Sequence, residues 1–239
     1  MPGLANFWCI TARRYIGLPG KEMFLGHFAI ALGAKRAAPR VSLGTFVLAA
    51  QFADMLWPVF LLLGWEQVRI VPGITRVTPL DFISYPWSHS LLAQLFWAIV
   101  LGSVFFAVNH SWRNALIVAA CVPSHWLLDY VSHRPDMPLY PGSARYGLGL
   151  WNSLSATLAV ELCLYVIGIA LYFEATSPRD SLGSYVTWSL LLLLVVLYVA
   201  SVFGPPTPNV KVLALSALAI WLTVPWAAWG DRHRQRSHP

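Results

Sequence analysis

Hydrophobic and polar positions along this chain fall into long apolar runs separated by polar connections. Charge-poor runs of about 20 residues are typical of helices that cross a lipid bilayer. We predict such spans at residues 41–63, 90–108, 115–131, 150–173, 184–203 and 212–229. An earlier run, residues 23–34, is too short to cross alone, but Lys35 and Arg36 extend it. The pattern predicts an all-α, polytopic transmembrane helix bundle of about seven helices, or six if residues 23–36 do not cross.

Composition supports a membrane protein. Hydrophobic residues make up 57% of the 239 residues and charged residues only 11%, whereas soluble domains average about 25% charged residues. The net charge of +6 does not indicate nucleic-acid binding, because the basic residues cluster at the ends of spans. The clusters are Lys35, Arg36 and Arg40, and then Arg232, Arg234 and Arg236. Basic span ends are typically cytoplasmic, so we expect a multi-pass protein with a cytoplasmic C-terminus.

The chain has no internal repeat and no room for a soluble domain, so we expect a single membrane domain at residues 23–231. Residues 232–239 would form a basic cytoplasmic tail. Residues 1–22 carry arginines and lack the apolar core of a signal peptide. We interpret them as an N-terminal extension that is either not native, with Met23 as the true start, or loosely held at the membrane interface.

The stretch from His125 to His133 carries the most informative chemistry. It places His125, Asp129 and His133 at positions i, i+4 and i+8, so the three side chains point from nearly one side of a helix. Ionisable groups are costly inside an apolar span, and those that persist usually face the protein interior, pair with each other or bind something. Imidazole nitrogens and carboxylate oxygens are also common ligands of zinc and similar divalent metals.

Five such groups lie within or beside apolar helices, and we predict them as metal ligands: His27, Asp54, His89, His125 and Asp129. Each one alone is more simply a hydrogen-bonded structural residue. Together they lie on four helices at a similar predicted depth, toward the outer side. Buried carboxylates need a nearby cation or donor, and one divalent ion would neutralise both. Zinc is the first choice, with manganese or iron as alternatives. A metal with an open coordination position activates water for hydrolysis.

Two further residues are candidates for catalysis. Arg134 is suited to bidentate binding of a phosphate or carboxylate, or else it pairs with Asp136 in a charged loop. Glu161 lies in the middle of an apolar span, so it needs a partner or a proton. It could carry a proton during catalysis, or form a hydrogen bond between helices. Asp81 could orient an imidazole or be a solvated loop residue.

These residues resemble a known family. Gly26-His27-Phe28, Ala53-Asp54, Ser88-His89-Ser90 and His125-Trp-Leu-Leu-Asp129 are similar to motifs of the bacterial YdjM-type family of membrane-bound metal-dependent hydrolases. The resemblance covers about residues 23–135 and implies a metal-dependent hydrolase of the bacterial inner membrane. Leu56 stands where the family often has a second aspartate, and a His-Arg pair is missing before Ser88. These departures favour one metal ion over a cluster.

The favoured interpretation is a membrane-embedded hydrolase that uses a metal-activated water on a lipidic or phosphoester substrate. A transporter or permease with a His/Asp/Glu relay is the first alternative, and its polar groups would form a path to both faces. The second is a non-catalytic membrane protein whose polar side chains hold helices together. Membrane lipid is the expected partner. The sequence leaves open the oligomeric state and the role of His133.

Overall fold

The computed structural model describes residues 24–237, and helices form most of this range. The expected N-terminal extension at residues 1–22 and the alternative start at Met23 lie outside the described residues. The longer helices are α1 (Leu25–Ala37), α2 (Leu43–Ala50), α3 (Phe52–Leu62), α5 (Leu91–Asn109), α6 (Trp112–Ser132), α7 (Leu154–Ala175), α8 (Ser181–Phe203), α9 (Val210–Ala217) and α10 (Thr223–Arg232). The short ones are α4 (Pro86–His89), η1 (Leu150–Asn152) and η2 (Leu218–Leu222). The predicted all-α bundle is confirmed.

Within the described residues, five helices are long and apolar enough to cross a bilayer, and the bent pair α2–α3 makes a sixth. The five are α5, α6, α7, α8 and the segment Val210–Arg232, which combines α9, η2 and α10. At 13 residues, α1 is about 20 Å long and falls short of the hydrocarbon thickness of about 30 Å. The chain is therefore a multi-pass membrane protein, and its helix lengths favour six spans over seven.

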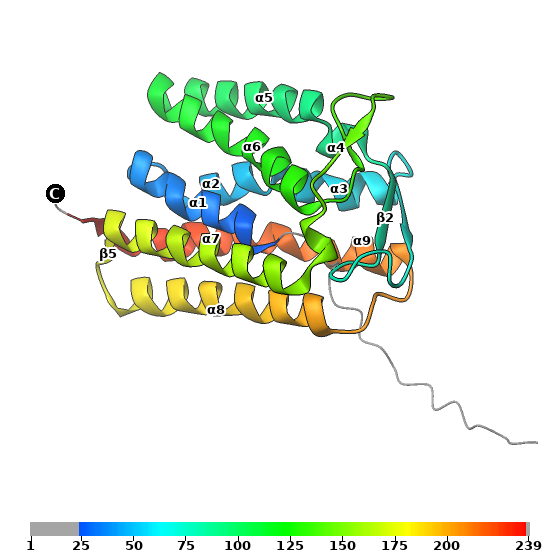
Figure 1. The fold of residues 1–239 in the computed structure, drawn as a ribbon. Coiled ribbons are helices and arrows are strands. Elements are labelled where there is room, and N and C mark those ends of the chain that lie inside the picture. Colours follow the sequence, from blue (N-terminus) through cyan, green and yellow to red (C-terminus); the bar gives the residue numbers. More distant parts are fainter. Residues whose placement is uncertain (1–23, 238–239) are drawn as a thin grey trace, which may run out of the picture.

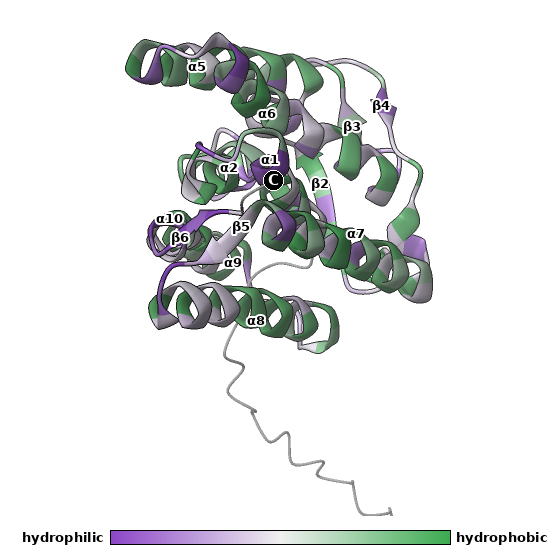
Figure 2. Ribbon diagram, turned by 90° about the vertical axis from the view of Figure 1, so that its left-hand side faces the viewer, coloured by the Kyte–Doolittle hydropathy of each residue, from purple (hydrophilic) through white to green (hydrophobic). Residues whose placement is uncertain are grey.

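The short helix α1 lies at the centre of the bundle (Figure 1), where it packs against α2, α6 and α7. It approaches α7 closely because Gly168 lies against the backbone of Ala29: a Cβ at Gly168 would lie 2.7 Å from the Ala29 carbonyl oxygen. Small residues permit such close helix contacts in membranes. In contrast, α5 and α8 lie at opposite edges of the bundle (Figure 2). Many of their apolar side chains are exposed. The core is thus built around a helix that crosses only part of the bundle.

The α2–α3 span is broken rather than straight. Ser42 caps α2, whose last residue is Ala50, and α3 begins at Phe52 after a bend of 53°. A break in a helix releases backbone carbonyls from their usual intrahelical partners. The Ala50 carbonyl therefore needs a donor from elsewhere in the fold, and that donor is a side chain of the candidate site.

Three small antiparallel sheets close the two ends of the bundle. They pair β1 (Gln67–Ile70) with β2 (Leu80–Ser84), β3 (Met137–Pro138) with β4 (Arg145–Tyr146), and β5 (Thr176–Pro178) with β6 (Arg234–Arg236). The first two lie at the end near α4, and the third lies at the opposite end with the C-terminus (Figure 1). Part of the segment expected as a basic tail therefore forms β6, where buried Arg234 lies over the rings of Tyr172 and Phe173.

Lys35, expected only as a basic residue flanking a membrane segment, is buried in a polar network at the C-terminal end of α1. Its ammonium group lies 2.5 Å from a carboxylate oxygen of Asp231 in α10 and donates to the Val41 carbonyl at 2.7 Å. Asp231 also accepts from the Leu43 backbone N–H and the Tyr172 hydroxyl. This network joins α1, α2, α7 and α10 at the end opposite the candidate site.

Candidate metal centre

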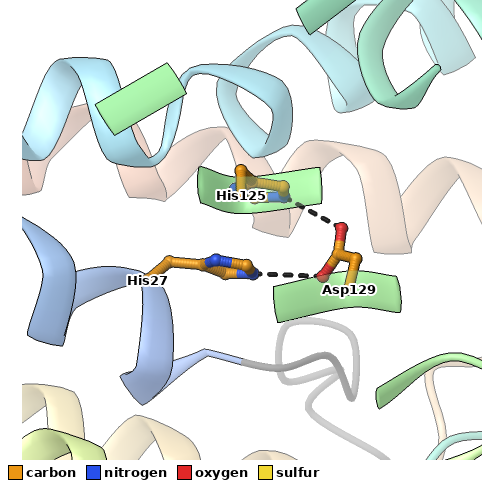
Figure 3. Close-up of side chains that lie close together, drawn as sticks. All are labelled: His27, His125 and Asp129. Carbon is orange, nitrogen blue, oxygen red and sulfur yellow. Dashed lines mark ion pairs between the residues drawn. The ribbon is translucent and has the colours of Figure 1, made fainter. Parts of the chain in front are cut away.

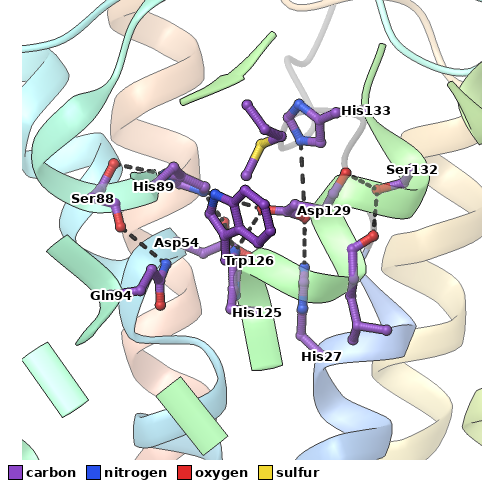
Figure 4. A network of polar contacts seen from close by, with 12 residues as sticks. His27, Asp54, Ser88, His89, Gln94, His125, Trp126, Asp129, Ser132 and His133 are labelled. Carbon is purple, nitrogen blue, oxygen red and sulfur yellow. Dashed lines mark hydrogen bonds and ion pairs between the residues drawn. The ribbon is translucent and has the colours of Figure 1, made fainter. Parts of the chain in front are cut away.

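The structure brings together the five side chains that the sequence predicts as metal ligands (Figure 4). Helix α1 supplies His27, α3 supplies Asp54, α4 supplies His89, and α6 supplies both His125 and Asp129. All five are buried. Asp54 is 7% exposed and the other four are at most 3% exposed. Four segments that are distant in sequence therefore meet in one buried cluster.

Asp129 lies at the centre of the cluster, and each of its carboxylate oxygens faces two imidazoles. Oδ1 lies 3.2 Å from Nε2 of His27 and 3.9 Å from Nε2 of His133. Oδ2 lies 3.2 Å from Nε2 of His125 and 3.8 Å from Nε2 of His89. Figure 3 shows the rings of His27 and His125 one above the other, each facing an oxygen of the Asp129 carboxylate. The i, i+4, i+8 spacing on α6 thus produces the expected common face.

Asp54 provides the second carboxylate. Its Oδ1 lies 3.4 Å from Nε2 of His89 and 3.4 Å from Nε2 of His125. Two groups of potential ligands result, His27–His125–Asp129 and Asp54–His89–His125, with ligand atoms within 4.8 Å of one another in each group. His125 belongs to both. These buried groups could hold a metal ion.

The ring of His125 is oriented by the break between α2 and α3. Its Nδ1 lies 2.9 Å from the Ala50 carbonyl oxygen. A carbonyl oxygen only accepts hydrogen bonds, so Nδ1 carries the proton in this contact. In the neutral ring, Nε2 then presents its lone pair to Asp54 and Asp129. This is the arrangement found in metal-bound histidines, whose second nitrogen is usually held by a carbonyl or carboxylate.

His89 is held in the same way through a serine. The Ser88 hydroxyl donates to Oε2 of Glu66 at 2.6 Å and lies 2.7 Å from Nδ1 of His89. Because the hydroxyl proton is used toward Glu66, the His89 Nδ1–H donates to Ser88 and leaves Nε2 facing inward. Glu66 also accepts from the backbone N–H groups of Trp87 and Ser88, both at 2.8 Å.

His133, whose role the sequence leaves open, is a third ring with this orientation. Its Nδ1 lies 2.9 Å from Oδ1 of Asp136, while its Nε2 faces Asp129. The Tyr85 hydroxyl donates to the same Asp136 oxygen at 3.1 Å. Burial raises the pKa of Tyr85 well above its usual value, and the charge of Asp136 adds to the effect, so this hydroxyl keeps its proton. The sequence signal for His133 is its spacing, because eight residues after His125 it falls on the same side of the helix as His125 and Asp129.

His27 differs from the other rings because its Nδ1 makes no hydrogen bond with the described part of the protein, although it is buried. Its ring stacks on that of His125, with the centroids 3.7 Å apart and the planes at 6°. His27 is thus positioned by stacking and by its place in the first turn of α1.

The spacing of the ligand atoms has a chemical meaning. Charge-assisted N–H···O bonds are typically about 2.7–2.9 Å long, but the shortest inward contacts here are 3.2–3.4 Å. Ligands bound about 2.0–2.2 Å from a tetrahedral zinc ion lie roughly 3.3–3.6 Å from one another. Moreover, His125 Nε2 and Asp129 Oδ2 are buried and form no hydrogen bond with the described residues. The spacing therefore leaves room for a cation between these groups.

Glu161 lies on α7 at the beginning of α1 rather than among the five predicted ligands. Its Oε2 accepts from the backbone N–H groups of Leu25 and Gly26 at 2.8 and 3.1 Å, and its Oε1 lies 3.3 Å from the nitrogen of Phe24. These are the N–H groups that a helix leaves unpaired, at the end where its dipole favours an anion. Glu161 therefore caps a buried helix terminus, and its predicted role as a proton carrier stays a prediction.

Arg134 lies beyond α6 at the outer edge of the cluster, with a side chain that is 32% exposed. Its guanidinium contacts Asp81 and donates to Asp136 at 3.1 Å, while Asp81 also accepts from Arg69 at 2.9 Å. These contacts match the charged-loop alternative for Arg134. The Asp81 carboxylate forms ion pairs with Arg134 and Arg69 and does not orient an imidazole of the described residues. Binding of a substrate anion by Arg134 stays a prediction.

Comparison with protein-family models, curated proteins and solved structures finds no match.

Proposed function

We propose that this chain is a membrane-embedded hydrolase that binds one zinc ion and uses it to activate water. The observation that carries the proposal is the orientation of three imidazoles, His89, His125 and His133. Each has its Nδ1 engaged away from the centre and its Nε2 directed toward a buried carboxylate. Such an arrangement puts lone pairs and negative charge around one small volume, which a divalent cation would stabilise.

The ligand set supports zinc, because neutral imidazoles and carboxylates suit this ion. The inward-facing atoms of His89, His125, Asp54 and Asp129 lie 3.2–3.8 Å apart around a ring, and three of these residues would bind the ion and leave one position for water. A zinc ion held there would lower the pKa of a bound water to about 7 and polarise a phosphoryl oxygen. In the proposed reaction, the water oxygen bonds to phosphorus, the bond from phosphorus to the alcohol oxygen breaks, and the water proton passes to that oxygen. The YdjM-type resemblance is consistent with this proposal.

The two alternative functions predict different arrangements. In a transporter, the buried ionisable groups would form a path between both ends of the bundle, whereas the cluster and the Lys35–Asp231 network lie at opposite ends. In a protein whose polar groups only hold helices together, the imidazoles and carboxylates would pair with each other. Here Nε2 of His125 and Oδ2 of Asp129 lie 3.2 Å apart, and neither atom forms a hydrogen bond within the described part of the chain. Hydrolysis remains the function that the geometry supports best.

The proposed function is tested by activity in lipid nanodiscs. Protein stripped with a chelator and then supplied with zinc should release the headgroup from phospholipids, detected by mass spectrometry. Asp129→Asn should lose at least about a hundredfold in rate, as expected when a catalytic metal loses a ligand. His110→Asn is the matched control, because His110 is an exposed residue with a positive φ that asparagine tolerates. Equal rates for Asp129→Asn, the wild type and the zinc-free protein would contradict the proposal.

A further inference from the structure

An apolar cleft of about 430 Å³ opens beside the metal centre. Its walls come from α3, α8 and the last span, which contains η2, with Phe24 at the beginning of α1. Among its apolar lining residues are Leu193, Leu197, Ala217 and Ile220. The volume is in the range of small-molecule sites, which are lined mostly by apolar side chains with a few polar groups.

The cleft exists because the two halves of the last span pack on different helices. In its second half, α10 packs on α2 and α8, and Gly230 lies against Val186 and Thr187 of α8. In its first half, α9 and η2 pack on α3 instead, and the Trp221 indole donates to the Met55 carbonyl at 3.1 Å. The two halves follow different neighbours, which leaves space between η2 and the second half of α8.

Asp54 links this space to the metal centre. It is the one charged residue in the lining of the cleft and also the most exposed of the five predicted ligands. The other polar lining groups, the hydroxyls of Ser216 and Thr223, donate to carbonyls of their own helix. The centre is therefore approached through an apolar passage that ends at one of its carboxylates.

Two unpartnered donors lie in the same lining. The indole N–H groups of Trp57 and Trp226 are buried and form no hydrogen bond with the described residues. Trp57 as a whole is only 2% exposed. A buried donor without a partner is costly, and indole N–H groups normally find one. Both indoles line the cleft beside Asp54, and a ligand with acceptor oxygens would supply their missing partners once the rings turn toward it.

We propose that this cleft binds a membrane phospholipid, with one acyl chain between α8 and η2 and its ester and phosphate oxygens toward Trp57, Trp226 and Asp54. The inference rests on the proposed function, whose substrate it names. The walls of the cleft are suited to an acyl chain, because they are apolar and belong to helices that cross the bilayer. The indole N–H groups and the metal centre are suited to the headgroup end of the lipid, because both bind oxygen atoms.

The test uses photocrosslinking in nanodiscs. The probes are phosphatidylglycerol with a diazirine in one acyl chain, and a diazirine-bearing hexadecane that has no acceptor oxygens. Crosslinked residues are mapped by mass spectrometry. Leu192 and Val196 on α8 are the internal reference, because they are 65% and 53% exposed and contact bulk lipid without lining the cleft.

We expect the phospholipid to label Leu193, Leu197 and Ile220 at least about fivefold over the reference residues, a preference of about 1 kcal/mol. The hexadecane probe should show no such preference. Ala217→Phe and Ala219→Phe, which narrow the cleft, should bring the labelling to the reference level, while Leu192→Phe leaves it unchanged. Each narrowing variant is an independent test should the other fail to fold.

Labelling of the cleft no stronger than that of the reference, or unchanged in both narrowing variants, would overturn the proposal. Equal selectivity for hexadecane would overturn the headgroup assignment. Zinc content measured on the same samples separates this inference from the proposed function. A zinc-free wild type with a labelled cleft would contradict the metal centre alone, and a zinc-loaded wild type with an unlabelled cleft would contradict the lipid site alone.

Discussion

At the scale of single residues, the candidate centre depends on the group that contacts Nδ1 of each imidazole, on the side of the ring away from the centre. A backbone carbonyl holds His125, a serine bonded to Glu66 holds His89, and Asp136 holds His133. These contacts determine which nitrogen faces the centre, so removing one should weaken metal binding without removing a ligand. Loss of such a supporting partner typically lowers metal affinity about 10–100-fold.

Ser88→Ala tests this directly. The substitution removes the hydroxyl that orients His89, so the zinc dissociation constant should rise about tenfold or more. Competition with a fluorescent zinc chelator measures the change. Ser124→Ala is the control, because Ser124 lies on α6 and, among the described residues, its hydroxyl donates only to the Cys121 carbonyl of the same helix. Equal affinities for the two variants would show that the support of His89 does not matter.

At the scale of helices, the centre depends on two departures from regular spans. The bend between α2 and α3 releases the carbonyl that orients His125. The early start of α1 inside the bundle places His27 at the depth of Asp129, with Glu161 at its buried terminus. Irregular backbone at membrane depth is tolerated where protein groups form hydrogen bonds with it. Here those groups are His125, which belongs to the site, and Glu161, which bonds to the backbone of Gly26 beside His27.

Glu161→Ala should destabilise the protein. It leaves buried N–H groups at the beginning of α1 without an acceptor, so we expect the free energy of unfolding to fall by about 2–4 kcal/mol. Glu174→Ala on the same helix should change it by less than about 1 kcal/mol, because its ion pair with Arg36 is exposed. Denaturant titration in detergent measures both.

Glu161→Gln separates the capping role from proton transfer. The amide oxygen still accepts from the backbone of α1, whereas an amide cannot exchange a proton with substrate. A variant with near-normal stability and zinc content but no hydrolysis would support the proton-carrier prediction. Full activity would assign Glu161 to capping alone.

The contact between α1 and α7 makes a third prediction at this scale. A side chain at Gly168 would overlap the backbone of Ala29, which cannot move without displacing His27. Gly168→Val should therefore lower both thermal stability and zinc affinity. Gly33→Ala is milder, because an added methyl meets only the flexible end of Leu171 at 3.3 Å. Unchanged zinc affinity in Gly168→Val would show that the position of α1 does not control the centre.

At the scale of the whole molecule, the sequence predicts the spans and the convergence of polar groups better than the contacts that orient them. Polar residues inside apolar runs are conspicuous, so His27, Asp54, His89, His125 and Asp129 can be found without a structure. The partner of Glu161 lies 136 residues away at a helix terminus, and the acceptor for His125 is a carbonyl released by a bend. Both depend on tertiary packing, which no local pattern records.

The basic residues near the C-terminal end of the last span predict sidedness, because basic span ends are typically cytoplasmic. We propose that the β3–β4 hairpin faces the outer side, and that the loop after β5 faces the cytoplasm together with the C-terminus. In a background without native cysteines, Ser143→Cys should react with a membrane-impermeant maleimide in intact cells. Arg179→Cys should react only after permeabilisation. Labelling of both in intact cells would contradict the proposed topology.

The most direct test of the whole account is the metal content of the purified protein. After expression with zinc and purification in detergent, inductively coupled plasma mass spectrometry should find about one zinc ion per wild-type chain, as a single site predicts. The double variant His125→Ala, Asp129→Ala should contain almost none, while circular dichroism shows its helices to be intact. A metal-free wild type, or equal metal in both proteins, would contradict the central claim that these buried imidazoles and carboxylates surround a cation.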